Sequence, residues 1–207
     1  MNPTKLRNIA VAATSLTLTP VAAQAHLLVT GMGPLYDGVL HFGFSPEDFL
    51  PVIVFGLFAG LRGARPSRMS LVTLAAAWLA GGVAAMFGFV IPQIGLSLTT
   101  AALFISIGVL LAANLELSDG ACALVAAVLG VVRGTAGLLG VLFSLAHLLT
   151  LLGMCATVFA VFAMATSVTR PLHRAWMIIA ARVSGSWLAA VGLLLAGWIA
   201  RYGAVVG

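Results

Sequence analysis

Between Asp48 and Arg201 the sequence consists of apolar runs that are long enough to cross a lipid bilayer and carry almost no charge. Only 7% of the 207 residues are Asp, Glu, Lys or Arg, whereas 62% are hydrophobic. An average globular domain carries about 25% charged residues, and the charges available are too few to cover a folded surface in water. The pattern predicts an all-α fold, a polytopic transmembrane helix bundle. It excludes a soluble enzyme, a nucleic-acid-binding module and a disordered chain.

Turn residues and the few charges divide the apolar part into six predicted helices. A hydrocarbon core of about 30 Å takes about 20 residues, so the first and the fourth helix are short for a complete span. Only glycines, which are common in membrane helices, mark the break between the fourth and the fifth. The predicted helices are Pro46–Leu61, Met69–Ile91, Gly95–Ala113, Gly120–Gly137, Leu138–Thr166 and Ala175–Ala200.

Residues 1–25 are predicted to form a secretory signal peptide. Lys5 and Arg7 make a short positive region, Ile9–Leu18 is an apolar run too short to span a bilayer, and residues 23–25 (Ala-Gln-Ala) have the small-x-small pattern of a cleavage site. Cleavage would leave His26 at the new N-terminus, where its amine and imidazole together can chelate a metal. Chance exposure of His26 is the simpler alternative.

The arginines predict the orientation of the bundle, because cytoplasmic loops carry an excess of Lys and Arg. Arginines lie in the first and the fifth loop between the six predicted helices, which are the loops after Leu61 and after Thr166. Both loops fall on the same side of the membrane. With six spans, this distribution places both chain ends on the outer side. We therefore expect a multi-pass protein of the plasma (inner) membrane whose mature N-terminus lies outside. The arginines of these two loops are Arg62, Arg65, Arg68, Arg170 and Arg174.

Small residues at a spacing of four predict where helices approach each other closely. Gly56 and Gly60 form one such pair, and Gly130 and Gly134 form another. Membrane helices associate through small residues because lipid provides no hydrophobic drive between helices. The pairs predict a compact bundle and leave open whether the contacts lie within the chain or between copies in a homo-oligomer.

Residues 26–45, ahead of the first predicted helix, contain glycines and prolines that oppose a continuous spanning helix. We expect an outer loop or a re-entrant segment there, with the bundle over residues 46–207. Ser45 is typical of a helix N-cap and Pro46 of a first helical residue. Glu47 and Asp48 then face the positive end of the helix dipole, and Asp48 would complete a capping box.

The same polar residues have a second interpretation, as metal ligands. His41, Glu47 and Asp48 would converge at the outer mouth of the bundle. Imidazole and carboxylate groups together suit divalent first-row metal ions, and ionisable residues near membrane spans are functional candidates by default. Helix capping and metal binding both remain open on spacing alone.

The sequence resembles the HupE/UreJ family of hydrogenase/urease accessory membrane proteins, which are linked to nickel supply. The resemblance extends over the whole mature chain. It rests on His26, the Gly-Pro-Leu-Tyr-Asp-Gly stretch at 33–38, His41 followed by an acidic pair, and the Arg-Val-Ser-Gly-Ser-Trp stretch at 182–187. The family signature His-Pro-x-x-Gly-x-Asp-His falls on His41, and the departures from it indicate a divergent branch. The residues at the proline, glycine, aspartate and second histidine of the signature are Phe42, Ser45, Glu47 and Asp48.

A second motif of the family, a His-Gly pair in a later helix, falls on Arg133 and Gly134. A guanidinium stays protonated and cannot ligate a metal ion. The predicted topology places Arg133 near the outer end of the fourth helix, at the depth of Glu47 and Asp48. We expect it to form an ion pair with those carboxylates, which its fork geometry suits. A fixed cation where a metal would bind counts against nickel transport.

Two further ionisable residues fall inside predicted spans. His147 is expected about ten residues into the fifth helix, either as a neutral imidazole bonded to a neighbouring helix or as a ligand on an ion pathway. Arg182 is expected to reach the cytoplasmic surface or to pair with Glu116 or Asp119.

Two functions remain in competition. In the first, the chain is a permease or delivery protein for a divalent metal such as nickel, which the resemblance implies as substrate. His26, His41, Glu47 and Asp48 would collect the ion and His147 would line its path. In the second, the chain is a non-transporting membrane subunit or assembly factor, and the Arg133–carboxylate pair is structural.

The sequence also carries expectations about catalysis, cofactors and partners. Phosphate-binding glycine loops, Cys-x-x-Cys pairs and serine-nucleophile elbows are not found, so we do not expect an enzyme. No resident cofactor is expected apart from a divalent metal ion as substrate. The predicted partners are the lipid bilayer, a metal ion, and a second copy or another membrane subunit, but no nucleic acid.

Overall fold

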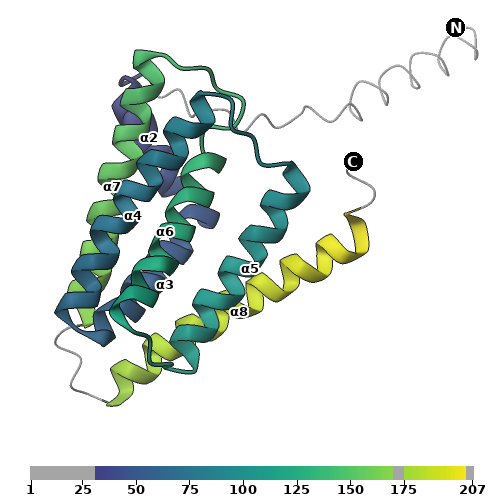
Figure 1. Cartoon of the computed structure of the whole chain (residues 1–207). Helices are drawn as coiled ribbons and strands as arrows, with labels where there is room; N and C mark the ends of the chain where they lie inside the picture. The colour runs from purple at the N-terminus through teal and green to yellow at the C-terminus, as the bar shows by residue number, and fades with distance from the viewer. Residues whose placement is uncertain (1–30, 170–174, 204–207) are drawn as a thin grey trace, which may run out of the picture.

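A computed structural model describes residues 31–169 and 175–203 of the chain, and this part consists of seven α-helices without a strand (Figure 1). The predicted all-α fold is confirmed. The predicted signal peptide and His26 lie outside the described residues. The helices are α2 (Pro34–Phe44), α3 (Pro46–Arg62), α4 (Ala64–Met86), α5 (Gln93–Ala112), α6 (Asp119–Ala136), α7 (Leu145–Thr169) and α8 (Ala175–Tyr202).

Five of the helices, α4 to α8, are long and apolar enough to cross a membrane. The helices α2 and α3 together pass the same test but are bent by 73° at their junction, so the described residues hold five candidate spans, or six if the bent pair is one span. Large apolar side chains such as Leu142, Leu194 and Trp187 are exposed on the outside of the bundle. Such a surface fits lipid rather than water.

The bend between α2 and α3 follows from Pro46. A proline disfavours helical geometry in the residue before it, and Ser45 is extended, with φ −98° and ψ 95°. Pro34 lies in the first turn of α2, as Pro46 does in α3, because the fixed φ of proline suits the first turn of a helix. The segment 31–45 is therefore largely helical, as a short helix set at an angle to α3.

The start of α7 differs from the sequence prediction. We expected the fifth predicted helix to begin at Leu138, but α7 begins at Leu145. The intervening residues have the composition of a membrane helix, yet Gly140 adopts φ +75°, a left-handed conformation that ends helical geometry. His147 is consequently the third residue of α7 and not the tenth of a longer helix. The prediction that it lies about ten residues into its helix is wrong.

Glycines bring helix backbones into direct contact, as the sequence predicted. A Cβ atom at Gly60 would lie 2.9 Å from the carbonyl oxygen of Thr166 in α7, and one at Gly134 would lie 2.2 Å from that of Trp78 in α4. The same holds for Gly38 of α2, where a Cβ would lie 2.0 Å from the carbonyl oxygen of Thr150. The small residues predicted to mediate packing therefore do so within the chain, between α3 and α7 and between α4 and α6.

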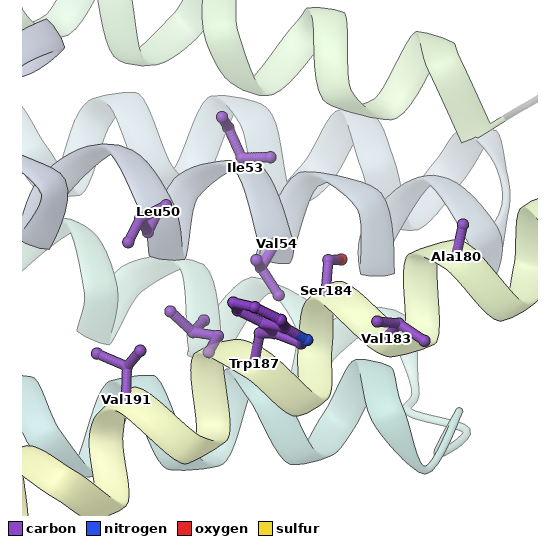
Figure 2. Close-up of a pocket in the computed structure, with 9 residues that line it drawn as sticks. Leu50, Ile53, Val54, Ala180, Val183, Ser184, Trp187 and Val191 are labelled. Carbon is purple, nitrogen blue, oxygen red and sulfur yellow. The ribbon is translucent and has the colours of Figure 1, made fainter.

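The helices α5 and α8 form a pair that slants away from the remaining helices (Figure 1). They contact the rest of the bundle mainly through α3. A cavity of about 430 Å³ lies between α3 and α8, and its lining is apolar except for Ser184 (Figure 2). Trp187 of α8 extends across it towards Val54 of α3. The lining of this cavity contains no charged group.

Candidate functional site

Two ends of the bundle are defined by α3. We call them the Asp48 end, where α3 begins, and the Arg62 end, where α3 finishes. At the Arg62 end α4 and α6 begin, and the Nε of Arg65 lies 3.1 Å from a carboxylate oxygen of Asp119. Asp48, Trp78, Thr100 and Arg133 each lie 12 to 14 residues from the Arg62 end of their helices. At a rise of about 1.5 Å per residue these four residues share a depth of about 18–21 Å.

The centre of the candidate site is a buried ion pair between α3 and α6. The Nε of Arg133 donates to Oδ1 of Asp48 at 2.6 Å. Both side chains are almost wholly inaccessible, with 4% of the Arg133 side chain and 2% of the Asp48 side chain exposed. The ion pair expected from the sequence is thus present. A buried ion is strongly destabilising without its counter-charge, so each of these residues depends on the other.

Two further groups complete the environment of the guanidinium. The Nη1 of Arg133 donates to the hydroxyl of Thr100 in α5 at 3.1 Å. Its Nη2 lies 3.4 Å from Oε1 of Glu47, whose side chain is 64% exposed. Glu47 is therefore the accessible member of the cluster and Asp48 the buried one. Exposed ion pairs contribute little to stability, about 0–1 kcal/mol.

His41 lies at the edge of this cluster. It is half-buried in α2, close enough to Asp48 for an electrostatic interaction. The next residue, Phe42, packs edge-on against Trp78 with ring centroids 5.7 Å apart. The angled helix α2 thereby brings His41 to the charged residues at the start of α3.

The capping box predicted at the start of α3 is wrong in its bonding. Ser45 does occupy the N-cap position, followed by Pro46 and two acids, but its side chain makes no capping bond. Its hydroxyl donates instead to the carbonyl oxygen of His41 at 2.7 Å. The carboxylate of Asp48 binds Arg133, because a hydrogen bond between two ions is stronger than one to a neutral amide. The side chain of Asp48 thus binds Arg133 in the candidate site and does not cap the start of α3.

The metal ligands proposed from the sequence are not all brought together. Within residues 31–169 and 175–203, no three His, Cys, Asp or Glu side chains are grouped closely enough to hold a metal ion. His147 is in the first turn of α7, where its Nδ1 lies 2.8 Å from the carbonyl oxygen of Leu142. His26 lies outside the described residues. A metal site formed by His26, His41, Glu47, Asp48 and His147 therefore stays a prediction.

At the Arg62 end, polar groups close the bundle. Arg62 donates to the side-chain oxygen of Asn114 and lies over the ring of Phe58, 5.3 Å from its centroid. The Nε of Arg182 donates to the carbonyl oxygen of Ala112 at 2.7 Å. Arg182 was expected to reach the surface or to pair with Glu116 or Asp119. Arg182 is exposed and binds the last turn of α5, where free carbonyl groups favour a cation.

Sequence reasoning missed two residues of the site, Thr100 and Trp78. Thr100 stands in an apolar run, where a threonine usually bonds to its own helix and gives no signal of a charged partner. Trp78 is 1% exposed, and its indole Nε1 has no hydrogen-bond partner among the described residues. A buried indole usually finds an acceptor, so only the structure marks it as unusual.

The fold and the site define a multi-pass membrane helix bundle with a buried arginine–carboxylate pair at one end. Comparison with known families then identifies the group. The family model described as HupE / UreJ protein matches residues 14–195, and the chain belongs to this family. Comparisons with curated proteins and with solved structures return no match.

Proposed function

We propose that this chain is an accessory membrane protein that moves or delivers a divalent metal ion of the nickel type, with the Asp48 end as the entrance for the ion. Membership of the HupE / UreJ family supports a nickel-related role. The observation that carries the proposal is the placement of Glu47, Asp48 and His41 around one end of the bundle. Acidic and imidazole groups attract and ligate divalent ions.

In this proposal Arg133 is an internal counter-ion. It neutralises Asp48 while the metal is elsewhere, and an arriving divalent ion replaces it. Glu47 makes the first contact because it is exposed, and Asp48 takes the ion after Arg133 has moved aside. The arginines at the Arg62 end favour a cytoplasmic position for that end. The Asp48 end would then face outwards and receive the ion from outside the cell.

The double variant His41→Ala/Glu47→Ala is expected to lose most metal-dependent uptake while retaining its fold. Both side chains are at least partly accessible, and neither forms the buried pair. The measurement is accumulation of radioactive nickel by cells that express equal amounts of each variant. The control is Arg65→Ala/Asp119→Ala, which breaks an exposed pair at the other end of the bundle. Uptake equal to that of the unmodified chain would contradict the proposal.

A second candidate function is supported by the short contact between Arg133 and Asp48. A non-transporting membrane subunit or assembly factor would use this pair only to hold α3 against α6. Metal analysis of the protein purified in detergent separates the two. Stoichiometric nickel in the isolated chain contradicts the assembly role, whereas a stable complex with another membrane subunit and no metal supports it.

A further inference from the structure

Three buried polar atoms of the described residues have no hydrogen-bond partner, and all three belong to α4 or the end of α3. They are the indole Nε1 of Trp78, the hydroxyl of Ser70 and the Nε of Arg62. Such groups are rare in folded proteins because each carries the full cost of losing water. Three of them on two consecutive helices need a common physical explanation.

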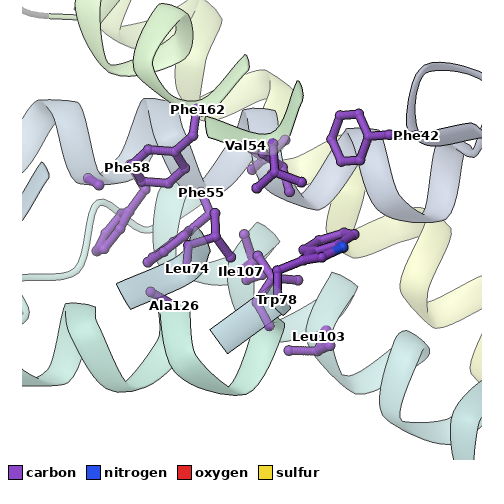
Figure 3. Packing of buried hydrophobic residues seen from close by; sticks show 14 of the residues in the cluster. Phe42, Val54, Phe55, Phe58, Leu74, Trp78, Leu103, Ile107, Ala126 and Phe162 are labelled. Atoms are coloured by element: carbon purple, nitrogen blue, oxygen red, sulfur yellow. The ribbon is translucent and has the colours of Figure 1, made fainter. Parts of the chain in front are cut away.

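The first of these atoms lies towards the Asp48 end of the bundle (Figure 3). Trp78 lies at the depth of Arg133, and the backbone of Gly134 packs directly against that of Trp78. The nitrogen edge of the indole points away from Phe55 and Ile107, towards the Asp48 end of the bundle (Figure 3). An N–H group in this position requires an acceptor, and the carboxylate–guanidinium pair at the same depth makes this level of the bundle polar.

The other two atoms lie near the opposite end. Ser70 is fully buried on α4, six residues after the first residue of that helix, about 9 Å from the Arg62 end at the usual helical rise. The guanidinium of Arg62 lies over the ring of Phe58, and one terminal nitrogen donates to the side-chain oxygen of Asn114. The Nε of Arg62 has no hydrogen-bond partner among the described residues. This region also contains Ser67, whose hydroxyl donates to the carbonyl oxygen of Ala59.

Between the two polar levels the interior is apolar. Phe55, Leu74 and Ile107 are each 0% exposed, and in Figure 3 they lie between Phe58 on one side and Trp78 on the other. Ser70 and Trp78 are eight residues apart on α4, about 12 Å along the helix. The unpartnered groups thus form two separate levels rather than one continuous column.

We propose that the interior holds two water sites, one bound by Trp78 beside the Arg133–Asp48 pair and one bound by Ser70 and Arg62, separated by a dry plug of Phe55, Leu74 and Ile107. Water is the ligand that fits both levels, because it can accept from an indole or guanidinium N–H and donate to a carboxylate or hydroxyl. Buried water typically binds two to four otherwise unpaired polar groups, about three on average. An anion would be repelled by Asp48 and Glu47.

The two water sites and the plug suggest a route for the metal ion, an interpretation that rests on the proposed function. Two wet regions separated by an apolar plug have the form of a closed ion pathway, in which a hydrated ion waits at either level and crosses only when the plug opens. The route would then follow α4, past Trp78 and Ser70, and would not use the apolar cavity between α3 and α8.

Hydroxyl-radical footprinting of the protein in lipid nanodiscs tests the water sites without any measurement of transport. Radicals formed from bound water label adjacent side chains even in a buried interior. We expect Trp78 and Phe58 to be labelled several-fold faster than Phe162 and Met154, which are as well buried but lie on α7. Phe55 should be labelled as slowly as these controls. Equal, slow labelling of all five would overturn the proposal.

Three further variants test the two water sites and the plug separately. Ser70→Ala removes the hydroxyl with little change of shape and should slow the labelling of Phe58 alone. Leu74→Ala should open the plug and raise the labelling of Phe55, whereas Leu151→Ala, equally buried on α7, should not. If Leu74→Ala and Leu151→Ala have the same effect, the plug does not exist. Water sites without nickel uptake would leave the inference standing and contradict only the proposed function.

Discussion

The single variant Arg133→Met is expected to be far less stable than the double variant Arg133→Met/Asp48→Leu. Removal of Arg133 alone leaves the carboxylate of Asp48 buried with no counter-charge, at 2% exposure. Breaking a buried pair in this way costs about 3–5 kcal/mol, whereas replacing both partners by apolar residues is often neutral or stabilising. Unfolding in a titration with sodium dodecyl sulfate, followed by the loss of monomeric protein in chromatography, measures the difference.

The double variant also separates the two candidate functions. It keeps α3 against α6 by apolar packing, and Thr100 can return its hydroxyl to its own helix backbone. If the pair is purely structural, the folded double variant should perform the normal role of the chain in cells. If Asp48 binds the metal, the double variant should fold and yet take up no nickel. If the double variant is as unstable as Arg133→Met alone, the buried Asp48 charge is not what destabilises the single variant, and this explanation is wrong.

The charged pair could be predicted from the sequence because membranes restrict charge so severely. Arg133 is surrounded by apolar residues, and a cation in that setting needs a counter-charge at the same depth. The acids at the start of α3 lie at that depth in the predicted topology. The sequence could not predict that Asp48 is buried against Arg133 while Glu47 stays exposed, because this depends on which of the two adjacent residues faces α6.

A charge or proline marked the ends of α3 correctly, but such signals misplaced α4, which was predicted as Met69–Ile91 and is Ala64–Met86. The predicted Pro46–Leu61 became α3 with one more residue, since both ends carry such signals. The start of α7 was misplaced by seven residues, because Leu138 and the residues after it are as apolar as a helix. The left-handed Gly140 that ends the preceding turn is one of many glycines in the chain, and nothing in its neighbours marks it.

Side-chain roles that depend on tertiary contacts were the least predictable. A buried tryptophan normally anchors packing, and Trp78 does pack against Phe42. That its indole N–H lacks a partner depends on how α4 is rotated relative to α3 and α6. Glycine contacts were partly predictable. A spacing of four indicates that another helix approaches closely, but it does not identify that helix.

Gly38→Ala is expected to disrupt the packing of α2, whereas Gly43→Ala in the same helix should be tolerated. A Cβ at Gly38 would lie 2.0 Å from the carbonyl oxygen and 2.8 Å from the carbonyl carbon of Thr150, so α2 and α7 must separate. Overpacking of this kind costs about 1–3 kcal/mol, occasionally more. A Cβ at Gly43 meets no atom within 4 Å, and alanine there gains up to about 1 kcal/mol of helix propensity.

The effect of Gly38→Ala should extend to the candidate site, because α2 carries both His41 and Phe42. Displacing α2 from α7 moves His41 away from Asp48 and withdraws Phe42 from Trp78, so nickel uptake should fall together with stability. Gly43→Ala controls for the loss of a glycine in the same helix, and both variants are measured in the same detergent titration and the same uptake assay. Equal stability and equal uptake of the two variants would show that α2 does not rest on α7. The angled helix would then not be what holds His41 beside the buried pair.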